Sequence, residues 1–496
     1  MLMYFLTRNL SRFRRFLHIN HLKLPNMTQI ETETYEKAIQ FLNEVQSNRN
    51  NLLTTSTQTI ASSQTSSHKL DLVKKYLIRS GMNINDFNKL PVIHVSGTKG
   101  KGSTCAFCES ILRHNGYKTG FFSSPHLIEV RERIRINGQP ISKEIFSQYF
   151  WNILKNLNSH KESEQDLPFY FQLLFIMAMH IFVKENVDVA IIEVGIGGEY
   201  DPTNIVKNVP VVGITSLGFD HTSVLGKTIE SIAWNKAGIM KKNSKVFTVS
   251  QPKDAYDILQ KRSIEKECTL NVVDNYCHLK CMQKYPLSIQ TNINLAIKMA
   301  EEWLISRSKQ NNSFLDADVL RESIENCIWP GRYDIQQKGN TTFFIDGAHT
   351  VESIEICVKW YLNEIKKREG KKALIFNLTG GRSCEKFFTI LKKCEFQQII
   401  FVPNVADTSN VNADNINLVS PVGEQLSLCN TYKEKWLSSA PEDEQVCVFP
   451  CVKEAMDFLH HKGQYNVLVT GSLHLVGAIL SLLNPDLNEN CPHVKL

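Results

Sequence analysis

A glycine-rich segment with two lysines carries the clearest chemical signal in the chain. Residues 96–104 read SGTKGKGST, follow the apolar run 92–95 and lead into a predicted helix, which is the order of a phosphate-binding loop. Glycines let backbone N–H groups converge on phosphate oxygens, and Lys101 would bring a full positive charge to the β- and γ-phosphates. The spacing departs from the common motif, because two residues separate the first glycines and a glycine follows Lys101. We predict a nucleotide site here, the alternative being a structural turn.

Acidic and basic side chains also stand at the ends of two later apolar runs. Glu193 closes the run that begins at residue 189, and Asp220-His221 follow the run 211–214. The carboxyl ends of parallel strands form the ligand crevice of an open sheet, and phosphate-bound Mg²⁺ typically uses one or two protein carboxylates. We therefore predict Glu193 as a magnesium ligand, the alternative being a solvated strand-end glutamate. Position favours a functional His221 over a structural one, whereas the spacing of Lys236 indicates only an ordinary helix-end lysine.

The elements that must position these residues form two alternating series. Short apolar runs at 92–95, 189–194, 211–214 and 246–249, then at 343–345, 373–376, 399–402 and 467–469, are separated by helical patterns. Such runs are typical of strands buried on both faces of a parallel sheet, so the fold class is α/β. Trp329-Pro330-Gly331 punctuates the two series. We predict a P-loop ATPase domain with a mostly parallel sheet at 31–328 and a smaller Rossmann-like α/β domain at 329–496.

Helical spacing predicts helices near 35–45 and 70–78, the second ending at Gly81, and a buried helix at 171–183 that is too short to span a membrane. The polar stretch 48–67 is predicted as a surface loop. No motif can be placed in 251–286.

Composition sets outer limits on function. The chain has 496 residues, of which 42% are hydrophobic and 21% charged, as in globular proteins of two or three domains. Its net charge of +6 is too small to argue for a nucleic-acid partner. The 13 cysteines show no framework spacing and favour a reducing compartment. We interpret Cys105 and Cys108 as helix packing rather than a zinc site, since no second ligand pair follows.

The first 30 residues indicate targeting. They contain five basic residues and no acidic one, with leucine and phenylalanine interleaved, the pattern of a mitochondrial transit peptide. A disordered basic tail is the alternative. Met27 follows the last basic residue of this segment, so we hypothesise that starts at Met1 and Met27 supply the mitochondrial matrix and the cytoplasm.

Taken together, these segments resemble the folylpolyglutamate synthases, within the Mur-ligase-like ATP-dependent amide ligases. The resemblance begins at YEKAIQFLNEVQSN (35–48) and continues, in the order of the family, through HVSGTKGKGS (94–103), FFSSPHL (121–127), VRERIRING (130–138), EVGIGGEYDPTN (193–204), SLGFDHTSVLGKTIESIAWNKAGIMK (216–241), WPGR (329–332), IDGAHT (345–350) and TGSLHLVG (470–477).

The resemblance implies an enzyme that extends the glutamate tail of reduced folates through γ-linked amides, using ATP and two Mg²⁺ ions. Whether a monovalent cation such as K⁺ is needed stays open. It implies these roles: Gly97, Thr98, Lys99, Gly100, Lys101, Gly102, Ser103, Asn292, Arg332 and Asp346 at the nucleotide; Ser124, Glu193 and His221 at the metals; a carbamylated Lys236 near the second metal; His349 and Ser472 at the incoming L-glutamate; and Arg133 at the folate. Two serines precede Pro125, so the choice of Ser124 over Ser123 is one of alignment.

The implied chemistry is transfer of the γ-phosphoryl group to a folate carboxylate, followed by attack of the glutamate amine on the acyl phosphate. A bifunctional dihydrofolate synthase and folylpolyglutamate synthase is the nearest alternative, and a catalytically silent nucleotide-binding homologue is a remote one. The family is usually monomeric. The basic loop at Arg131, Arg133 and Arg135 fits either a polyanionic substrate tail or a solvated hairpin rim.

Overall fold

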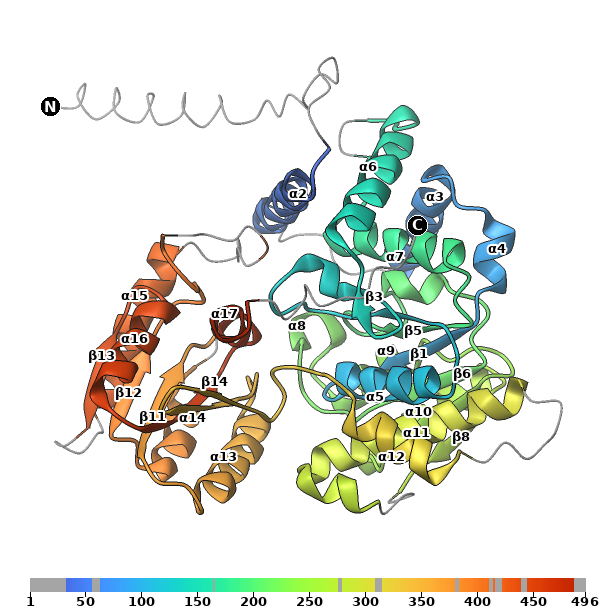
Figure 1. Ribbon diagram of the computed structural model, residues 1–496. Helices are drawn as coiled ribbons and strands as arrows, with labels where there is room; N and C mark the ends of the chain where they lie inside the picture. Colours follow the sequence, from blue (N-terminus) through green and yellow to red (C-terminus); the bar gives the residue numbers. More distant parts are fainter. Residues whose placement is uncertain are drawn as a thin grey trace, which may run out of the picture. The chain divides into compact units, whose positions relative to one another are not determined.

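The structure is a computed structural model of the chain (Figure 1), and it describes residues 33–55, 63–163, 166–274, 279–307, 315–379, 383–409, 414, 422–438 and 444–485. The chain divides into Met1–Thr34 and a compact unit Tyr35–Leu496. The predicted leader at 1–30 and the second start at Met27 lie outside the described residues. The fold described below is that of the compact unit.

The first sheet has eight strands in the order β4-β3-β2-β5-β1-β6-β7-β8. The neighbouring strands β2, β5, β1, β6, β7 and β8 pair in parallel. The strands β3 and β4 add an antiparallel edge beside β2. Their bounds are β1 (Val92–Ser96), β2 (Thr119–Phe122), β3 (Ile134–Ile136), β4 (Gln139–Pro140), β5 (Val189–Glu193), β6 (Val211–Ile214), β7 (Lys245–Thr248) and β8 (Thr269–Val272). The mostly parallel sheet predicted from the apolar runs is confirmed, while β2, β3, β4 and β8 were not predicted.

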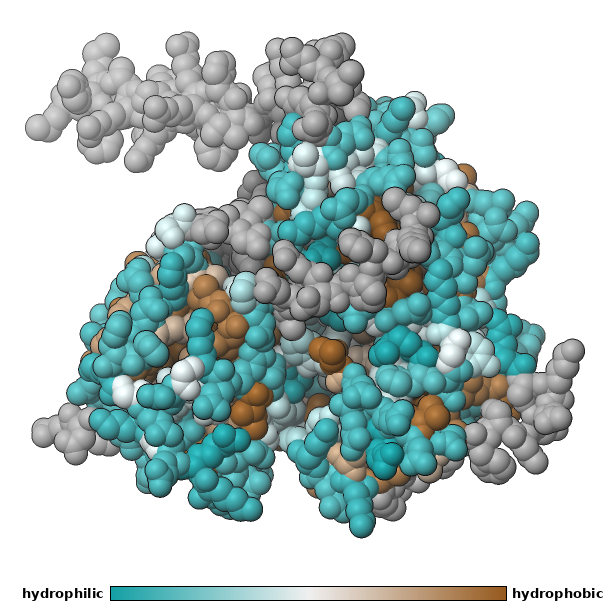
Figure 2. Space-filling model, in the orientation of Figure 1, coloured by the Kyte–Doolittle hydropathy of each residue, from teal (hydrophilic) through white to brown (hydrophobic). Residues whose placement is uncertain are grey.

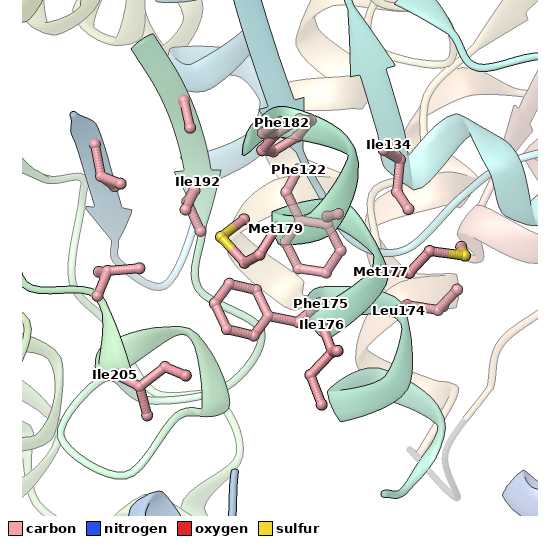
Figure 3. Close-up of a cluster of buried hydrophobic side chains, with 14 of the residues drawn as sticks. Phe122, Ile134, Leu174, Phe175, Ile176, Met177, Met179, Phe182, Ile192 and Ile205 are labelled. Carbon is pink, nitrogen blue, oxygen red and sulfur yellow. The ribbon is translucent and has the colours of Figure 1, made fainter. Parts of the chain in front are cut away.

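Helices cover both faces of this sheet because its strands bury alternate residues on opposite sides. In β5, Ala190 and Ile192 join the hydrophobic cluster around α7 (Tyr170–Lys184), whereas Val189 and Ile191 join the cluster on the other face. Figure 3 shows Phe175 and Met179 of α7 beside Ile192. The first face also receives α2 (Tyr35–Thr55), α3 (Ser63–Arg79), α4 (Ile84–Lys89), α6 (Lys143–Ser159), α9 (Ile229–Ala237) and α10 (Lys253–Glu265), and the second α5 (Lys101–His114), α11 (Leu287–Arg307) and α12 (Ala317–Glu325).

The second sheet has six strands in the order β13-β12-β11-β14-β10-β9, parallel except for β9 at its edge. Its strands are β9 (Asp334–Lys338), β10 (Thr341–Ile345), β11 (Lys371–Phe376), β12 (Gln398–Phe401), β13 (Gln445–Val448) and β14 (Tyr465–Thr470). The helices α13 (Val351–Ile365), α14 (Glu385–Leu391) and α15 (Val422–Leu437) pack on one face, and α16 (Val452–Lys462) and α17 (Leu473–Leu483) pack on the other. The two predicted series of strands thus form two sheets.

One predicted loop is wrong. The stretch 48–67 was assigned to a surface loop, but α2 extends to Thr55 and α3 begins at Ser63, while 56–62 lie outside the described residues. Asn, Ser, Thr and Gln are only modestly unfavourable in helices, so their abundance does not end one. The segment without a motif, 251–286, contains α10, β8 and the short 3₁₀ helix Lys280–Lys284, and it completes one edge of the first sheet.

Hydrophilic side chains cover most of the face drawn in Figure 2, with smaller apolar patches between them. Among the described residues, no helix has the length and apolar character needed to cross a bilayer. Cys105 and Cys108 are fully buried on α5, as predicted for helix packing.

Candidate active site

Three strand ends of the first sheet meet at one point. β1 lies between β5 and β6 and runs parallel to both, with Val95 opposite Glu193 and Ser96 opposite Ile214. The glycine-rich loop that follows β1 is therefore flanked by the carboxyl ends of its two neighbours. This is the topological switch point at which open α/β sheets bind ligands, and the positions of the predicted residues agree with it.

Two glycines fix the path of the loop. Gly97 and Gly100 have φ values of 145° and 88°. A Cβ atom on Gly97 would lie 1.8 Å from Thr215 Oγ1, and one on Gly100 would lie 2.3 Å from Asn292 Oδ1. Any side chain would have to displace these neighbours, so the loop lies against β6 and α11 only as glycine.

The loop amides divide into two groups. Those of Thr98 and Lys99 donate to the carbonyl of Ser216 at 2.9 and 3.2 Å, and this fixes the loop against the end of β6. Gly100 is the N-cap of α5, so the next three N–H groups, those of residues 101–103, have no intrahelical acceptor. The first turn of α5 is therefore the part of the loop whose amides are oriented for an anion.

Glu193 is a buried carboxylate without a salt bridge to any described residue. Its side chain is 4% exposed, and Oε2 accepts one hydrogen bond, from Ser124 N at 2.9 Å. Burial raises the pKa of Glu193, while the positive charges of Lys101, Arg332 and Arg133 act in the opposite direction. A desolvated carboxylate is costly unless a cation or a donor set compensates it. An oxygen ligand of this kind fits a hard cation such as Mg²⁺.

The described residues contain no cluster of three or more His, Cys, Asp or Glu side chains suited to a metal. A cation at Glu193 would therefore take other ligands from hydroxyl groups, phosphate or water, which is the usual pattern for Mg²⁺. His221 follows β6 in a left-handed conformation, with a φ of 50°. Burial lowers the pKa of His221, and nearby lysines lower it further. Although the charge of Asp220 acts in the opposite direction, the shift favours the neutral imidazole, which is the form that binds a metal.

Lys236, on α9, lies under the glycine-rich loop. The side chain is buried, and Nζ donates to the carbonyl of Gly97 at 2.6 Å. Burial, followed by the charge of Lys101, lowers the pKa of Lys236 to about 7. A large fraction of this amine is therefore neutral near pH 7, and the neutral amine is the form that reacts with CO₂. Helix-end spacing gave no sign of this environment.

Lys99 joins the two sheets. Its Nζ lies 3.0 Å from Asp220 Oδ2 and 3.0 Å from His349 Nε2, which belongs to the segment after β10. His349 Nδ1 lies 2.8 Å from the carbonyl of Gly347, so Nδ1 carries the proton and Nε2 accepts from Lys99. Burial would raise the pKa of Asp220, but Lys99 holds it down, at about 2. The phosphate loop and the end of the second sheet thus share one ammonium group.

The remaining predicted residues of the second sheet lie at the ends of β10 and β14, which are neighbours. Asp346 is 5% exposed and accepts a hydrogen bond from Tyr333 N at 3.1 Å. Burial raises the pKa of Asp346 to about 6, against the charge of Arg332. Ser472 is buried and caps α17, and its Oγ accepts from His474 N at 3.2 Å. The structure brings Asp346, Arg332, His349 and Ser472 to one edge.

The basic loop is not a solvated rim. Arg131 and Arg133 are 4% and 9% exposed. Arg131 Nε donates to Glu129 Oε2 at 2.7 Å, and Arg133 Nε donates to His126 Nδ1 at 2.9 Å. Only Arg135 is half-buried, with its guanidinium over the Trp329 ring. The hairpin-rim interpretation is wrong for the first two arginines, because the loop packs against the body of the protein.

Several residues that build the site were not singled out from the sequence. Asp201 accepts hydrogen bonds from Ile196 N and Thr203 Oγ1, which fixes the glycines after Glu193. Asp201 precedes Pro202, and an N-cap followed by proline is a signal that could have identified it. By contrast, His126 Nε2 lies 3.0 Å from the carbonyl of Asp414, 288 residues away, and no local pattern marks such a contact.

Comparisons with known proteins agree with this geometry. Residues 331–482 match a family described as dihydrofolate synthetase, C-terminal domain. The chain is 36% identical to the mitochondrial folylpolyglutamate synthase of Homo sapiens and 34% identical to that of Cricetulus griseus, with 92% of each chain covered in both cases. A structure of Mycobacterium tuberculosis folylpolyglutamate synthase complexed with ADP and AMPPCP matches with a TM-score of 0.68 and 22% identity over 84% of this chain and 95% of that one. Identity of this extent to the curated relatives shows that the chain belongs to the folylpolyglutamate synthase family.

Proposed function

We propose that the protein is an ATP-dependent ligase that adds L-glutamate, through γ-linked amide bonds, to the glutamate tail of tetrahydrofolates. The observation that carries this proposal is the Lys99 contact, which places the phosphate loop of the first sheet against His349 of the second. The relatives named as folylpolyglutamate synthases supply the substrate class. The two sheets correspond to a nucleotide-binding domain at 31–328 and a glutamate-ligase domain at 329–496.

In this proposal different residues at the site bind ATP, L-glutamate and the folate. The triphosphate is held by the loop 97–103, and Asn292, Arg332 and Asp346 contact the nucleotide from the other side. His349 and Ser472 bind the incoming L-glutamate, and Arg133 binds the folate tail. The folate carboxylate attacks the γ-phosphorus of ATP and ADP leaves, and Lys101 and the first turn of α5 stabilise the charge that develops there. The amine of glutamate then attacks the acyl phosphate, and phosphate leaves as the amide forms.

The residues present fit Mg²⁺. Ser124 and Glu193 would hold one ion, and Glu193 and His221 a second, with Lys236 as a carbamate near it. Bound Mg²⁺ would neutralise phosphate charge and orient the γ-phosphoryl group. The buried, unpaired carboxylate of Glu193 and the lowered pKa of Lys236 support these roles. Mass spectrometry of the native protein in bicarbonate tests the carbamate, and assays with and without K⁺ test for a monovalent cation.

The test of the function is product analysis. The protein started at Met27 is incubated with ATP, Mg²⁺, L-glutamate and tetrahydrofolate, and ADP release and folate mass are followed. Glutamate-dependent ADP release with mass steps of one glutamyl unit is the expected result. Nucleotide binding without turnover would identify a silent homologue. Lys101→Ala is expected to lower turnover at least ~100-fold, and near wild-type activity would reject the phosphate-loop assignment.

A second candidate function is a bifunctional enzyme that also adds the first glutamate to dihydropteroate. The match of residues 331–482 to a dihydrofolate synthetase domain favours testing it. Dihydropteroate run in parallel separates the two, since only a bifunctional enzyme would release ADP with that pterin.

We further propose a monomer that reaches both the mitochondrial matrix and the cytoplasm through starts at Met1 and Met27. The mitochondrial names of the relatives support the first destination. Import of a Met27-started form as efficient as that of the full chain would contradict the role of residues 1–30. Light scattering after gel filtration measures the oligomeric state.

A further inference from the structure

Arg133 is a buried cation that lacks a carboxylate partner among the described residues. Its side chain is 9% exposed, and its guanidinium lies over the Tyr170 ring, with the Cζ atom 5.2 Å from the ring centroid. Its positive charge acts electrostatically on Glu193 and on His474. Taking an unpaired charge out of water is costly. A guanidinium held in this way favours an anion beside it.

The group that holds Arg133 is a neutral histidine. Arg133 Nε donates to His126 Nδ1 at 2.9 Å, so Nδ1 carries no proton. His126 Nε2 lies 3.0 Å from the carbonyl oxygen of Asp414, which can only accept, so Nε2 carries the proton. A carboxylate in this place would neutralise Arg133, whereas the imidazole orients the guanidinium and leaves its charge available.

The far side of the histidine is anchored. Asp414 is buried, and its Oδ1 accepts from Val130 N at 2.8 Å and from Tyr35 Oη at 2.6 Å. The same residue thus fixes the loop that carries Arg133 and, through its carbonyl, the ring that orients Arg133. The imidazole has one rotational position in which both of its nitrogens are satisfied.

We propose that His126 is a positioning residue that aims the terminal nitrogens of Arg133 at a carboxylate of the folate glutamate tail. The proposal rests on the function proposed above and deepens it by naming the group that sets the geometry of the tail site. With Nε bonded to His126, the two terminal NH₂ groups remain for a carboxylate. Charge-assisted contacts of this type are strong and directional.

The two nitrogens of His126 can be tested separately. In His126→Asn the side-chain oxygen can occupy the place of Nδ1, so the acceptor for Arg133 is retained and the donor to Asp414 is lost. In His126→Gln the amide reaches the place of Nε2, so the donor is retained and the acceptor is lost. We expect His126→Gln to raise the KM for tetrahydrofolate about tenfold or more, with the KM for ATP changed less than about threefold. His126→Asn is expected to stay within about threefold of wild type for both substrates.

Two further variants guard against a merely structural effect. Arg133→Lys keeps the charge but lacks both the Nε–H for His126 and the terminal NH₂ groups, so its KM for tetrahydrofolate should rise at least as much as that of His126→Gln. In an Arg133→Met background, His126→Gln should add no further increase. If His126→Gln lowers the melting temperature, the Arg133→Met background still decides the case, because a merely structural effect of His126→Gln on the KM would persist there.

Equal KM values for the Asn and Gln variants, or an equal rise in the KM values for ATP and folate, would overturn the positioning role. Wild type is measured in the same assay. Absence of glutamate-dependent turnover in wild type would reject the proposed function, and with it the tail site. Normal wild-type turnover with an unchanged His126→Gln would reject the positioning role alone.

Discussion

Glu193 and Asp346 occupy equivalent places in the two sheets but are held differently. Each stands at the end of a parallel strand and is at most 5% exposed. Glu193 accepts one backbone hydrogen bond, from Ser124, and the lysine and arginines around it act only through their charge. Asp346 accepts from the backbone of Tyr333 and of Ala348, and so fixes the turn that precedes the second sheet.

The difference separates a carboxylate that also holds a backbone turn from one whose oxygens are left almost entirely to a ligand. Removing Asp346 leaves a backbone donor without its acceptor, whereas changing Glu193 to an amide removes a buried charge and leaves an oxygen for Ser124. Burial alone does not distinguish the two. What distinguishes Glu193 from Asp346 is the number of backbone N–H groups from which each carboxylate accepts a hydrogen bond.

The largest expected effect is at Glu193. Glu193→Gln should lower turnover at least ~100-fold, because the oxygen remains but the charge that a phosphate-bound cation needs is lost. Its melting temperature should equal or exceed that of wild type, since an uncompensated buried charge is removed. Steady-state kinetics and thermal unfolding measure the two quantities. A destabilised Glu193→Gln that retains activity would place Glu193 with Asp346 as a residue of the fold.

At Asp346 we expect a loss of stability. Asp346→Ala should lower the free energy of unfolding by about 2 kcal/mol, because the N–H of Tyr333 loses its acceptor in a buried turn. Denaturant unfolding measures this, with Thr342→Ala, a half-buried position on β10, as a control. A raised KM for ATP agrees with the proposed nucleotide contact, whereas unchanged stability would show that Asp346 is not needed for the turn.

Sequence reasoning was most successful where chemistry and local spacing coincide. The loop 96–104 could be assigned because glycines, a lysine and a following helix are contiguous, and Glu193 because it ends an apolar strand. Strands buried on both faces were found for the same reason. The short strands β2 and β3 and the edge strands β4, β8, β9 and β13 have partly polar or very short sequences, and their register depends on neighbours elsewhere in the chain.

Contacts between distant segments set the rest of the site. The environment of Lys236 arises from Gly97, which lies 139 residues away, and the Lys99 contact spans 250 residues to His349. Residue type and local sequence are the same for a solvated lysine as for Lys236 on its helix or Lys99 in its loop. The resemblance to the family indicated Lys236 and His349 as site residues, but the geometry that joins Lys99 to His349 required the structure.

The contact between Lys99 and His349, which links the two sheets, gives the next prediction. Lys99→Met should raise the KM for L-glutamate about tenfold, because His349 Nε2 loses its charged donor. The KM for ATP should change less, since the backbone N–H of residue 99 still donates to Ser216. Lys99→Arg is the conservative control. A rise confined to the KM for ATP would assign the side chain to the phosphates.

The smallest expected effect concerns the pH dependence of stability at Lys236. Its pKa is about 7 in the folded protein and 10.5 for an ordinary lysine, so between these values the unfolded chain binds more protons than the folded one. Stability must therefore rise with pH across this window and fall as pH drops toward 7. From pH 7 to pH 8 the rise due to this group is about 1 kcal/mol. Denaturant unfolding in CO₂-free buffer measures it in wild type and in Lys236→Met, which should lack this part of the slope.

Lys242→Met, at an exposed position, is the matched control and should retain the full slope of stability against pH. If Lys236→Met and wild type have the same slope, the amine is charged in the folded protein and cannot supply the neutral form that a carbamate requires. If bicarbonate steepens the slope of wild type and leaves the slope of Lys236→Met as it was, the lysine has been converted to an anion, because the folded carbamate holds no proton while the unfolded amine still binds one. That result would make Lys236 an anionic group that acts together with Glu193 at the end of the first sheet. Asp346 of the second sheet would differ from both, because its oxygens also hold a backbone turn.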